Sequence, residues 1–390
     1  MKKILSMAAV FAMLPFAVFA QEPIKIGFIS TFSGPQGVLG TELSDGFKLG
    51  LRHTQQKLGS RDVEIVYGDD QAKPDIGRQL ADKMIESDRV QIVTGINFSN
   101  VLLAVAKPVL DAGAFYVSVN AGPHQYAGKQ CHPHFFAASF QNDQTNEAIG
   151  IHMQNLKLDD VYIMAPNYPA GKDMLTGFKR YFKGKISGEV YTAFGQLDYA
   201  AEIAQIRAAK PKAVMFFYPG GMGINFVKQY AQAGLKDQIP LFVGSHVIDQ
   251  TVLPAIGEAA VGVQAAALWS ESLDNPASKR FASDFEKEYK RIPSPYAALA
   301  YDTVLMLDAA LTSIGGKIED KAAFRKAMED VKFESIRGSF RFNKNHFPIQ
   351  NAYLTEIAKD SAGRFVNAYR GVIATNLQDA YAGECNMPTE

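Results

Sequence analysis

The sequence predicts an α/β protein of two similar lobes, each with a parallel sheet flanked by helices. Short β-branched and apolar runs alternate with helical patterns along most of the chain, and the loops between them are short. The alternation starts afresh near Gln141, and one sheet could not comfortably take all the strands. The chain has 390 residues, of which 47% are hydrophobic and 21% charged, so it is long enough for two domains.

The first twenty residues have the pattern of a cleaved secretory signal. Lys2 and Lys3 precede an apolar run at 4–19, and Ala20 ends a small-residue cleavage site. Removing residues 1–20 takes away two of the 40 basic residues and none of the 40 acidic ones, which leaves a net charge of −2. This balance gives no reason to expect a nucleic-acid or membrane-surface partner. We expect secretion, without an anchor, into the space outside a bacterial inner membrane.

The elements of the first lobe follow from its apolar runs. Strands are expected at 24–30, 63–68, 90–94, 115–119 and 135–138, and helices at 41–56, 74–86 and 101–110. A Gly-rich loop at 31–40 follows the first strand, where a phosphate-binding loop would lie. No Lys-Ser or Lys-Thr pair follows its glycines, so we reject phosphate binding.

The second lobe repeats the pattern after a polar stretch at 139–144. Strands are expected at 161–165, 189–193, 213–218 and 240–244, with helices at 173–182, 200–209 and 224–233. A strand at 261–269 then returns toward the first lobe, and it is followed by helices at 276–290, 296–311 and 320–328 and strands at 338–342 and 352–357. We therefore expect the first lobe to comprise 21–141 and 270–345, and the second 142–269 and 346–390.

The strand, helix and strand between residues 90 and 123 carry the clearest sign of a binding site. Gly95, Asn97, Ser99 and Asn100 follow the first strand and put donors at a helix start, where an anion is favoured. The small residues of 120–122 follow the second strand and let a ligand approach the backbone. Open α/β sheets bind ligands at the carboxyl ends of their strands. The alternative is ordinary capping and turn chemistry.

Motifs for cofactor or catalytic chemistry are incomplete. The glycines of 219–223 suggest a dinucleotide loop, but Phe226 stands at the third glycine position and no acidic residue ends the next strand. Cys131, His132 and His134 lack a second cluster at metal-ligand spacing. No Gly-x-Ser-x-Gly elbow occurs either. We therefore expect no cofactor, no metal and no enzymatic activity.

Cys131 and Cys385 are the only cysteines. In an oxidising compartment, an even pair favours one disulfide, which would tie the C-terminal tail to the region after the 120–122 loop. The alternative is two unpaired thiols that are far apart in space.

Several short motifs occur in a characteristic order along the mature chain. They are Lys25-Ile26-Gly27, Ser33-Gly34-Pro35 with Gly40, Tyr67-Gly68-Asp69-Asp70, Gly95 with Ser99, Asn120-Ala121-Gly122-Pro123, and Tyr168 with Gly171-Lys172-Asp173. This order resembles the periplasmic binding proteins of ABC transporters, in the leucine/isoleucine/valine-binding class. The resemblance implies a type I fold, in which two Rossmann-like lobes are joined by three crossovers and close on the ligand by a hinge. It also implies a periplasmic carrier that serves a membrane permease, and we expect this carrier to be a monomer.

The resemblance also implies roles for individual residues. Ser99 and the backbone N–H groups from Asn120 through Ala121 to Gly122 would hold a ligand carboxylate. Leu39 falls where relatives present an aromatic or aliphatic wall. Further candidates for the walls, which could equally be core aromatics, are Phe98, Tyr168 and Tyr218.

One loop departs from the amino-acid binders of this class. After the strand at 240–244, those proteins place a carboxylate that pairs with the ligand ammonium, whereas this chain has His246 in a Gly-Ser-His-Val sequence. An unpaired buried ammonium is costly, so we expect a ligand without an α-amine. The segments 118–123, 131–136 and 139–143 resemble the branch of the family associated with aromatic acids. This resemblance implies a ligand of the benzoate or hydroxycinnamate type, with any ring hydroxyl facing His246. Two alternatives stay open. Asp249 or Asp69 could supply the missing carboxylate for an amino acid, or the fold could serve a ligand-sensing receptor.

Overall fold

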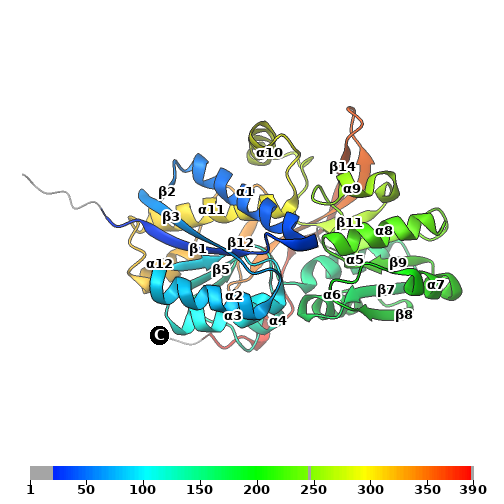
Figure 1. Cartoon of the computed structure of the whole chain (residues 1–390), viewed down its shortest axis with the longest axis horizontal. Coiled ribbons are helices and arrows are strands. Elements are labelled where there is room, and N and C mark those ends of the chain that lie inside the picture. The colour runs from blue at the N-terminus through cyan, green and yellow to red at the C-terminus, as the bar shows by residue number, and fades with distance from the viewer. Residues whose placement is uncertain (1–20, 245–246, 388–390) are drawn as a thin grey trace, which may run out of the picture.

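The computed structural model describes residues 21–244 and 247–387, which form two α/β lobes side by side (Figure 1). One sheet has six strands in the order β2-β3-β1-β4-β5-β6. The other has eight, in the order β12-β13-β11-β10-β9-β7-β8 with β14 paired to β13. We call the six-stranded sheet with its helices the first lobe, and the eight-stranded sheet with its helices the second lobe. The predicted fold class, parallel sheets flanked by helices, is confirmed.

The first lobe is built around β1, whose apolar side chains are fully buried between two layers of helices. Its strands are β1 (Ile24–Ser30), β2 (Lys57–Leu58), β3 (Arg61–Asp69), β4 (Ile92–Thr94), β5 (Phe115–Ser118) and β6 (Phe135–Ala137), all parallel except the short edge strand β2. Its helices include α1 (Gly37–His53), α2 (Pro74–Lys83), α3 (Ser99–Asp111), α4 (His124–Ala127), α10 (Pro276–Tyr289), α11 (Pro295–Ser313) and α12 (Lys321–Glu329). Gly46 lets α1 approach α11, since a β-carbon there would lie 2.0 Å from the Ala297 carbonyl oxygen.

The second lobe combines a parallel sheet with an antiparallel extension. The parallel strands are β7 (Asp160–Pro166), β8 (Lys185–Thr192), β9 (Ala213–Phe216), β10 (Leu241–Gly244) and β11 (Gln264–Ala267). The helices around them are α5 (Asp143–Asn155), α6 (Pro169–Tyr181), α7 (Ala200–Ala209), α8 (Gly221–Gln232) and α9 (Leu253–Ile256). The antiparallel strands are β12 (Phe340–Phe342), β13 (Pro348–Lys359) and β14 (Phe365–Leu377).

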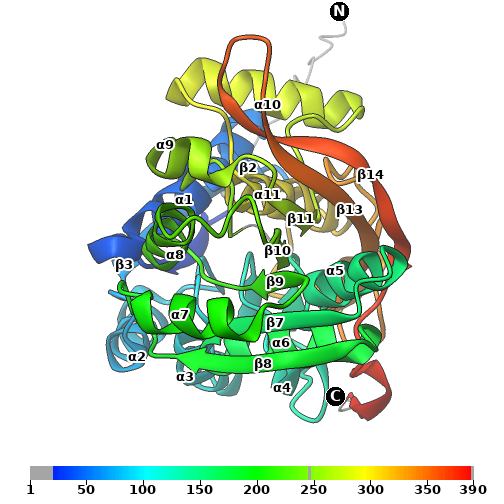
Figure 2. The same ribbon diagram turned by 90° about the vertical axis from the view of Figure 1, so that its right-hand side faces the viewer.

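β14, which was not expected from the sequence, forms a long hairpin with β13 that rises beside α10 (Figure 2). Most residues of β14 are only partly buried or exposed, and Gly371 lies within the strand. The strand therefore lacks the apolar run by which a buried strand is recognised. Its backbone hydrogen bonds to β13 stabilise it instead.

The connections between the lobes meet at Arg337, whose side chain is 1% exposed. Its guanidinium pairs with Asp302 at 2.8 Å and donates to the carbonyls of Ala138 and Ser139 and to Gln350 Oε1. These partners lie on three separate parts of the chain, namely α11, the residues just after β6, and β13. Because the buried charge is paired and its donors are used, Arg337 fixes how these segments are arranged at the hinge.

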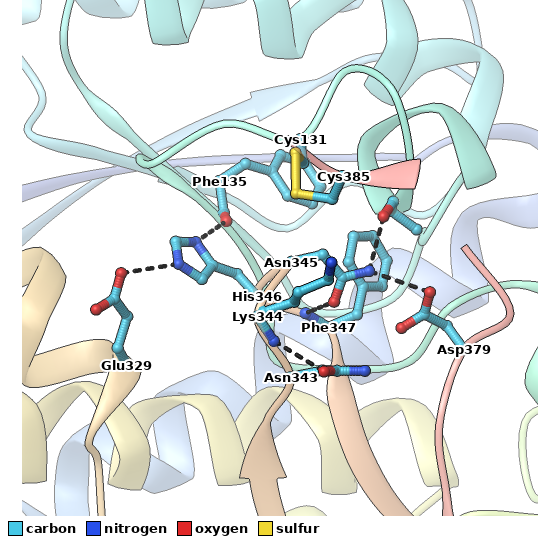
Figure 3. The surroundings of a disulfide bond; sticks show 11 residues. Cys131, Phe135, Glu329, Asn343, Lys344, Asn345, His346, Phe347, Asp379 and Cys385 are labelled. Carbon is cyan, nitrogen blue, oxygen red and sulfur yellow. Dashed lines mark hydrogen bonds and ion pairs between the residues drawn. A yellow bond between two sulfur atoms is a disulfide. The ribbon is translucent and has the colours of Figure 1, made fainter. Parts of the chain in front are cut away.

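The C-terminal tail leaves β14 and returns to the first lobe, where the predicted disulfide between Cys131 and Cys385 is confirmed (Figure 3). The two Cα atoms are 5.7 Å apart. Asn345 Nδ2 donates to Asp379 of the tail at 3.0 Å and to the Ala127 carbonyl at 2.7 Å. We expected residues 346–390 in the second lobe, but the tail lies against α4 of the first and forms a further link across the hinge.

The proposed signal segment, residues 1–20, lies outside the described residues. Within 21–244 and 247–387, the helices are too short or too polar to cross a membrane.

Candidate functional site

A cavity lies between the two lobes at the carboxyl ends of both parallel sheets. Its empty space amounts to about 350 Å³. Residues of both lobes and of the hinge line it: Leu39, Asn97, Phe98, Ser99, Asn120, Ala121, Phe140, Asn142, Tyr168, Ala170, Met174, Phe217, Pro219 and Tyr296. None of these lining residues carries a charge.

The lobes are in direct contact at the rim of the cavity, so this is a closed form. Gly220 of the second lobe has φ +61°, and a β-carbon there would lie 2.0 Å from Gln36 Oε1 of the first lobe. A β-carbon on Gly221 would lie 3.2 Å from Pro35 Cβ. The glycines at 219–223 that suggested a dinucleotide loop therefore allow the lobes to approach each other closely.

The N-terminus of α3 forms one end of the cavity. Phe98 is its N-cap residue and supplies no side-chain acceptor, and the N–H groups of Ser99 and Asn100 have no acceptor among the described residues. A helix start with free N–H groups carries a partial positive charge. This end of the cavity is therefore electrostatically suited to an anion.

Asn97 adds a side-chain donor to the same end. Its Oδ1 accepts hydrogen bonds from Ser30 Oγ and from the Thr31 N–H, which fixes the orientation of the amide. Its Nδ2 is buried and has no partner among the described residues. A buried amide donor without a partner is costly, so the site is completed when a ligand oxygen accepts from it.

Ser99 is oriented by Asn142, which lies where the chain crosses between the lobes. Asn142 Nδ2 donates to Ser99 Oγ at 3.1 Å, so the Ser99 hydroxyl keeps its own proton to donate. Asn142 Oδ1 accepts from the Gly122 N–H at 2.9 Å. The Gly122 N–H is therefore already used, whereas the Ala121 N–H has no acceptor among the described residues.

Aromatic and aliphatic side chains form the remaining walls. The rings of Tyr168 and Phe217 are nearly parallel, at 10°, and Phe98 meets Tyr168 at 68°. Burial raises the pKa of the Tyr168 hydroxyl well above its usual value, so it stays protonated. That hydroxyl has no hydrogen bond to another described residue. The walls are thus apolar, with one neutral polar group that a ligand could use.

The structure brings most of the predicted site residues together. Leu39, Phe98, Ser99, Asn120, Ala121 and Tyr168 all line the cavity, whereas Gly122 lies behind the lining. Tyr218 packs in the core of the second lobe, 4.9 Å from the Tyr199 ring, and its neighbour Phe217 faces the cavity. His246 lies outside the described residues.

Asn97 lines the cavity from the polar loop that the sequence marked as a donor-rich helix start, whereas Asn142 and Phe217 were not expected in the site. Asn142 lies in the polar stretch at 139–144, but nothing in the sequence shows that this stretch folds back onto Ser99. Among the described residues, no group of His, Cys, Asp and Glu could hold a metal ion.

Comparisons with known proteins agree with this architecture. The profile of the periplasmic binding protein family matches residues 23–363. A Leu/Ile/Val-binding protein homologue of Brucella melitensis is 29% identical over 94% of this chain and 96% of its own.

Two solved structures are also similar along nearly their whole length. An ABC-transporter solute-binding protein of R. palustris in complex with benzoate has a TM-score of 0.88 at 30% identity, covering 94% of this chain and 100% of its own. One of Rhodopseudomonas palustris BisB5 in complex with 3,4-dihydroxybenzoic acid has a TM-score of 0.86 at 28% identity, covering 92% and 99%. By its profile match and its two-lobed architecture, this chain belongs to the periplasmic binding protein family.

Proposed function

We propose that this protein binds a small aromatic carboxylate in the inter-lobe cavity and delivers it to the membrane permease of an ABC transporter. The observation that carries the proposal is the unpartnered Asn97 amide beside the N-terminus of α3. A buried carboxylate needs hydrogen-bond donors, and this end of the cavity offers neutral ones without a competing acid. Ser99 and the Ala121 N–H would complete the donor set, and the apolar walls suit a ring.

The absence of charged side chains from the described lining argues against an amino-acid ligand. An α-ammonium would enter a cavity whose described lining has no carboxylate. Asp249 is buried outside that lining, and burial raises its pKa to about 8, so it is protonated at neutral pH. Leaving a buried charge unpaired costs about 3–5 kcal/mol, which would abolish tight binding. Asp69 instead accepts from the backbone of Phe32 and Gln71.

Relatives support both the proposal and one alternative. The R. palustris complexes contain benzoate and 3,4-dihydroxybenzoic acid, which favours a benzoate or hydroxycinnamate type of ligand here. The Brucella relative carries the name of branched-chain amino-acid binding proteins, so such an amino acid is the second candidate.

We place the protein in the periplasm, as a monomer with a cleaved signal at 1–20. A sensing role would be favoured by a stable complex with a sensor protein.

A thermal-shift screen of the mature protein tests the ligand class. A ligand at 100 times its Kd stabilises the folded state by about 2.7 kcal/mol, which raises Tm measurably. We expect benzoate and 4-hydroxybenzoate to raise Tm, leucine to leave it unchanged, and the bound ligand to be recovered without chemical change. A shift with leucine alone would reject the aromatic ligand and retain the carrier role. Formation of a product would reject the carrier role.

A further inference from the structure

An ion pair joins the lobes beside the cavity. His124, in α4 of the first lobe, has its Nδ1 2.7 Å from Asp173 Oδ1, in α6 of the second lobe. The His124 backbone N–H also donates to Asp173 Oδ2, at 3.3 Å. The Asp173 side chain is 4% exposed and that of His124 is 43% exposed. The carboxylate is thus almost completely shielded from water in this closed form.

Asp173 also contacts the residue that orients Ser99. Asn142 Nδ2 donates to Asp173 Oδ2 at 2.9 Å and to Ser99 Oγ at 3.1 Å. One amide nitrogen therefore bridges the carboxylate of the inter-lobe pair and the hydroxyl on the cavity wall. Its two hydrogens have separate acceptors, and its oxygen accepts from Gly122, so the side chain is held in one orientation.

We propose that His124 and Asp173 form a latch that engages when the lobes close and that, through Asn142, holds Ser99 ready to donate to the ligand. The inference rests on the proposed function for the identity of the ligand. His124 and Asp173 are positioning residues, since neither lines the cavity. Opening the lobes separates His124 from Asp173, and the same movement weakens the constraint on Asn142. Lobe closure and the orientation of the Ser99 donor are therefore coupled.

The surroundings of His124 favour its protonated form in the closed state. Asp173 faces it from α6, Asp143 from α5 and Glu384 from the tail, and the ring of Tyr381 lies 5.5 Å away. Asp143 is itself paired with Arg180 at 2.9 Å. The carboxylates outnumber this single guanidinium, so an imidazolium gains from closure. Ligand affinity should therefore rise when His124 is protonated.

Calorimetric titration with benzoate tests the latch in the full mature chain. His124→Gln and Asp173→Asn should each weaken binding about tenfold, as expected for loss of one charge-assisted hydrogen bond, and the double variant should be no weaker than either. Wild-type affinity should fall as the pH rises through the raised pKa of His124, and His124→Gln should flatten that profile. His152→Gln is the matched control, because His152 pairs with Gln264 inside the second lobe.

Spin-label distances measure closure independently of affinity. Labels on Lys107→Cys in α3 and Lys228→Cys in α8 report the separation of the lobes while the native disulfide stays intact. We expect both latch variants, but not His152→Gln, to shift the distribution toward longer distances. Unchanged affinity, pH profile and distances would overturn the latch and leave the ligand proposal standing. If benzoate does not bind the wild type, the spin-label distances decide by themselves. A shift toward longer distances in His124→Gln then supports the latch, and no shift overturns it.

Discussion

Asn142 Nδ2 donates a hydrogen bond to Ser99 Oγ over 3.1 Å, and this bond determines which way the Ser99 hydroxyl can point. An oxygen that already accepts from an amide directs its own proton elsewhere, and Ser99 lies on the cavity wall. The donor is therefore held in one orientation in the closed form. Such preorganisation lowers the cost of binding, because the ligand itself does not have to order the hydroxyl.

Removing the Ser99 hydroxyl tests this arrangement. We expect Ser99→Ala to weaken benzoate binding by about 1–3 kcal/mol, the contribution of a hydrogen bond to a charged group. Calorimetry measures the change, and Ser187→Ala, which removes a hydroxyl bonded to the Val161 carbonyl in the second lobe, is the control. Equal affinities for Ser99→Ala and the wild type would remove Ser99 from the site.

Asn97 offers a sharper test of charge. Asn97→Asp replaces the unpartnered donor by a carboxylate at the end of the cavity that we assign to the ligand anion. Two like charges in a desolvated site repel, so we expect a loss of affinity larger than that of Ser99→Ala. Asn351→Asp, on β13 and outside the lining, should bind benzoate normally. Normal binding by Asn97→Asp would show that the carboxylate lies elsewhere.

The pH dependence of binding follows from His124. The hydrogen bond with Asp173 raises the pKa of His124 above its ordinary value of 6.5 in the closed form. A raised pKa means that protonation favours closure, so the gain is fully present below pH 6.5 and is lost as the pH rises through the raised pKa. Benzoate Kd measured across this range should increase with pH. A flat wild-type profile would contradict the assignment.

The disulfide should contribute to stability more than to binding. Cys131 and Cys385 are 254 residues apart, and closing so long a loop restricts the unfolded chain. We expect Cys131→Ser with Cys385→Ser to lower the free energy of unfolding by about 3–5 kcal/mol. Urea unfolding measures the loss. Titration of the unfolded wild type should detect no free thiol, and two free thiols would contradict the bond.

The sequence was sufficient for the fold class and for placing the start of α3 at the cavity, because both follow from local pattern. A polar loop after a buried strand and before a helix places Ser99 and the N-terminus of α3 where parallel sheets bind ligands. The disulfide followed from there being only two cysteines in an oxidising compartment. The half-exposed β14 had no comparable pattern.

The rest depends on contacts between distant segments. Phe217 and Tyr218 are adjacent, and only the path of the chain beyond β9 decides that Phe217 faces the cavity while Tyr218 packs on Tyr199. Asn142 meets Ser99 across 43 positions of sequence, and Asp173 meets His124 across 49. No local periodicity encodes such meetings, because they arise from the packing of the two lobes.

The most direct test of the central claim is a crystal structure of the mature protein with benzoate. We predict that the ring lies between the lobes against Tyr168 and Phe217, and that the carboxylate accepts from Asn97 Nδ2 and Ser99 Oγ at the N-terminus of α3. A benzoate bound outside this cavity would contradict the account, as would a cavity occupied by an amino acid whose ammonium pairs with a carboxylate of this chain.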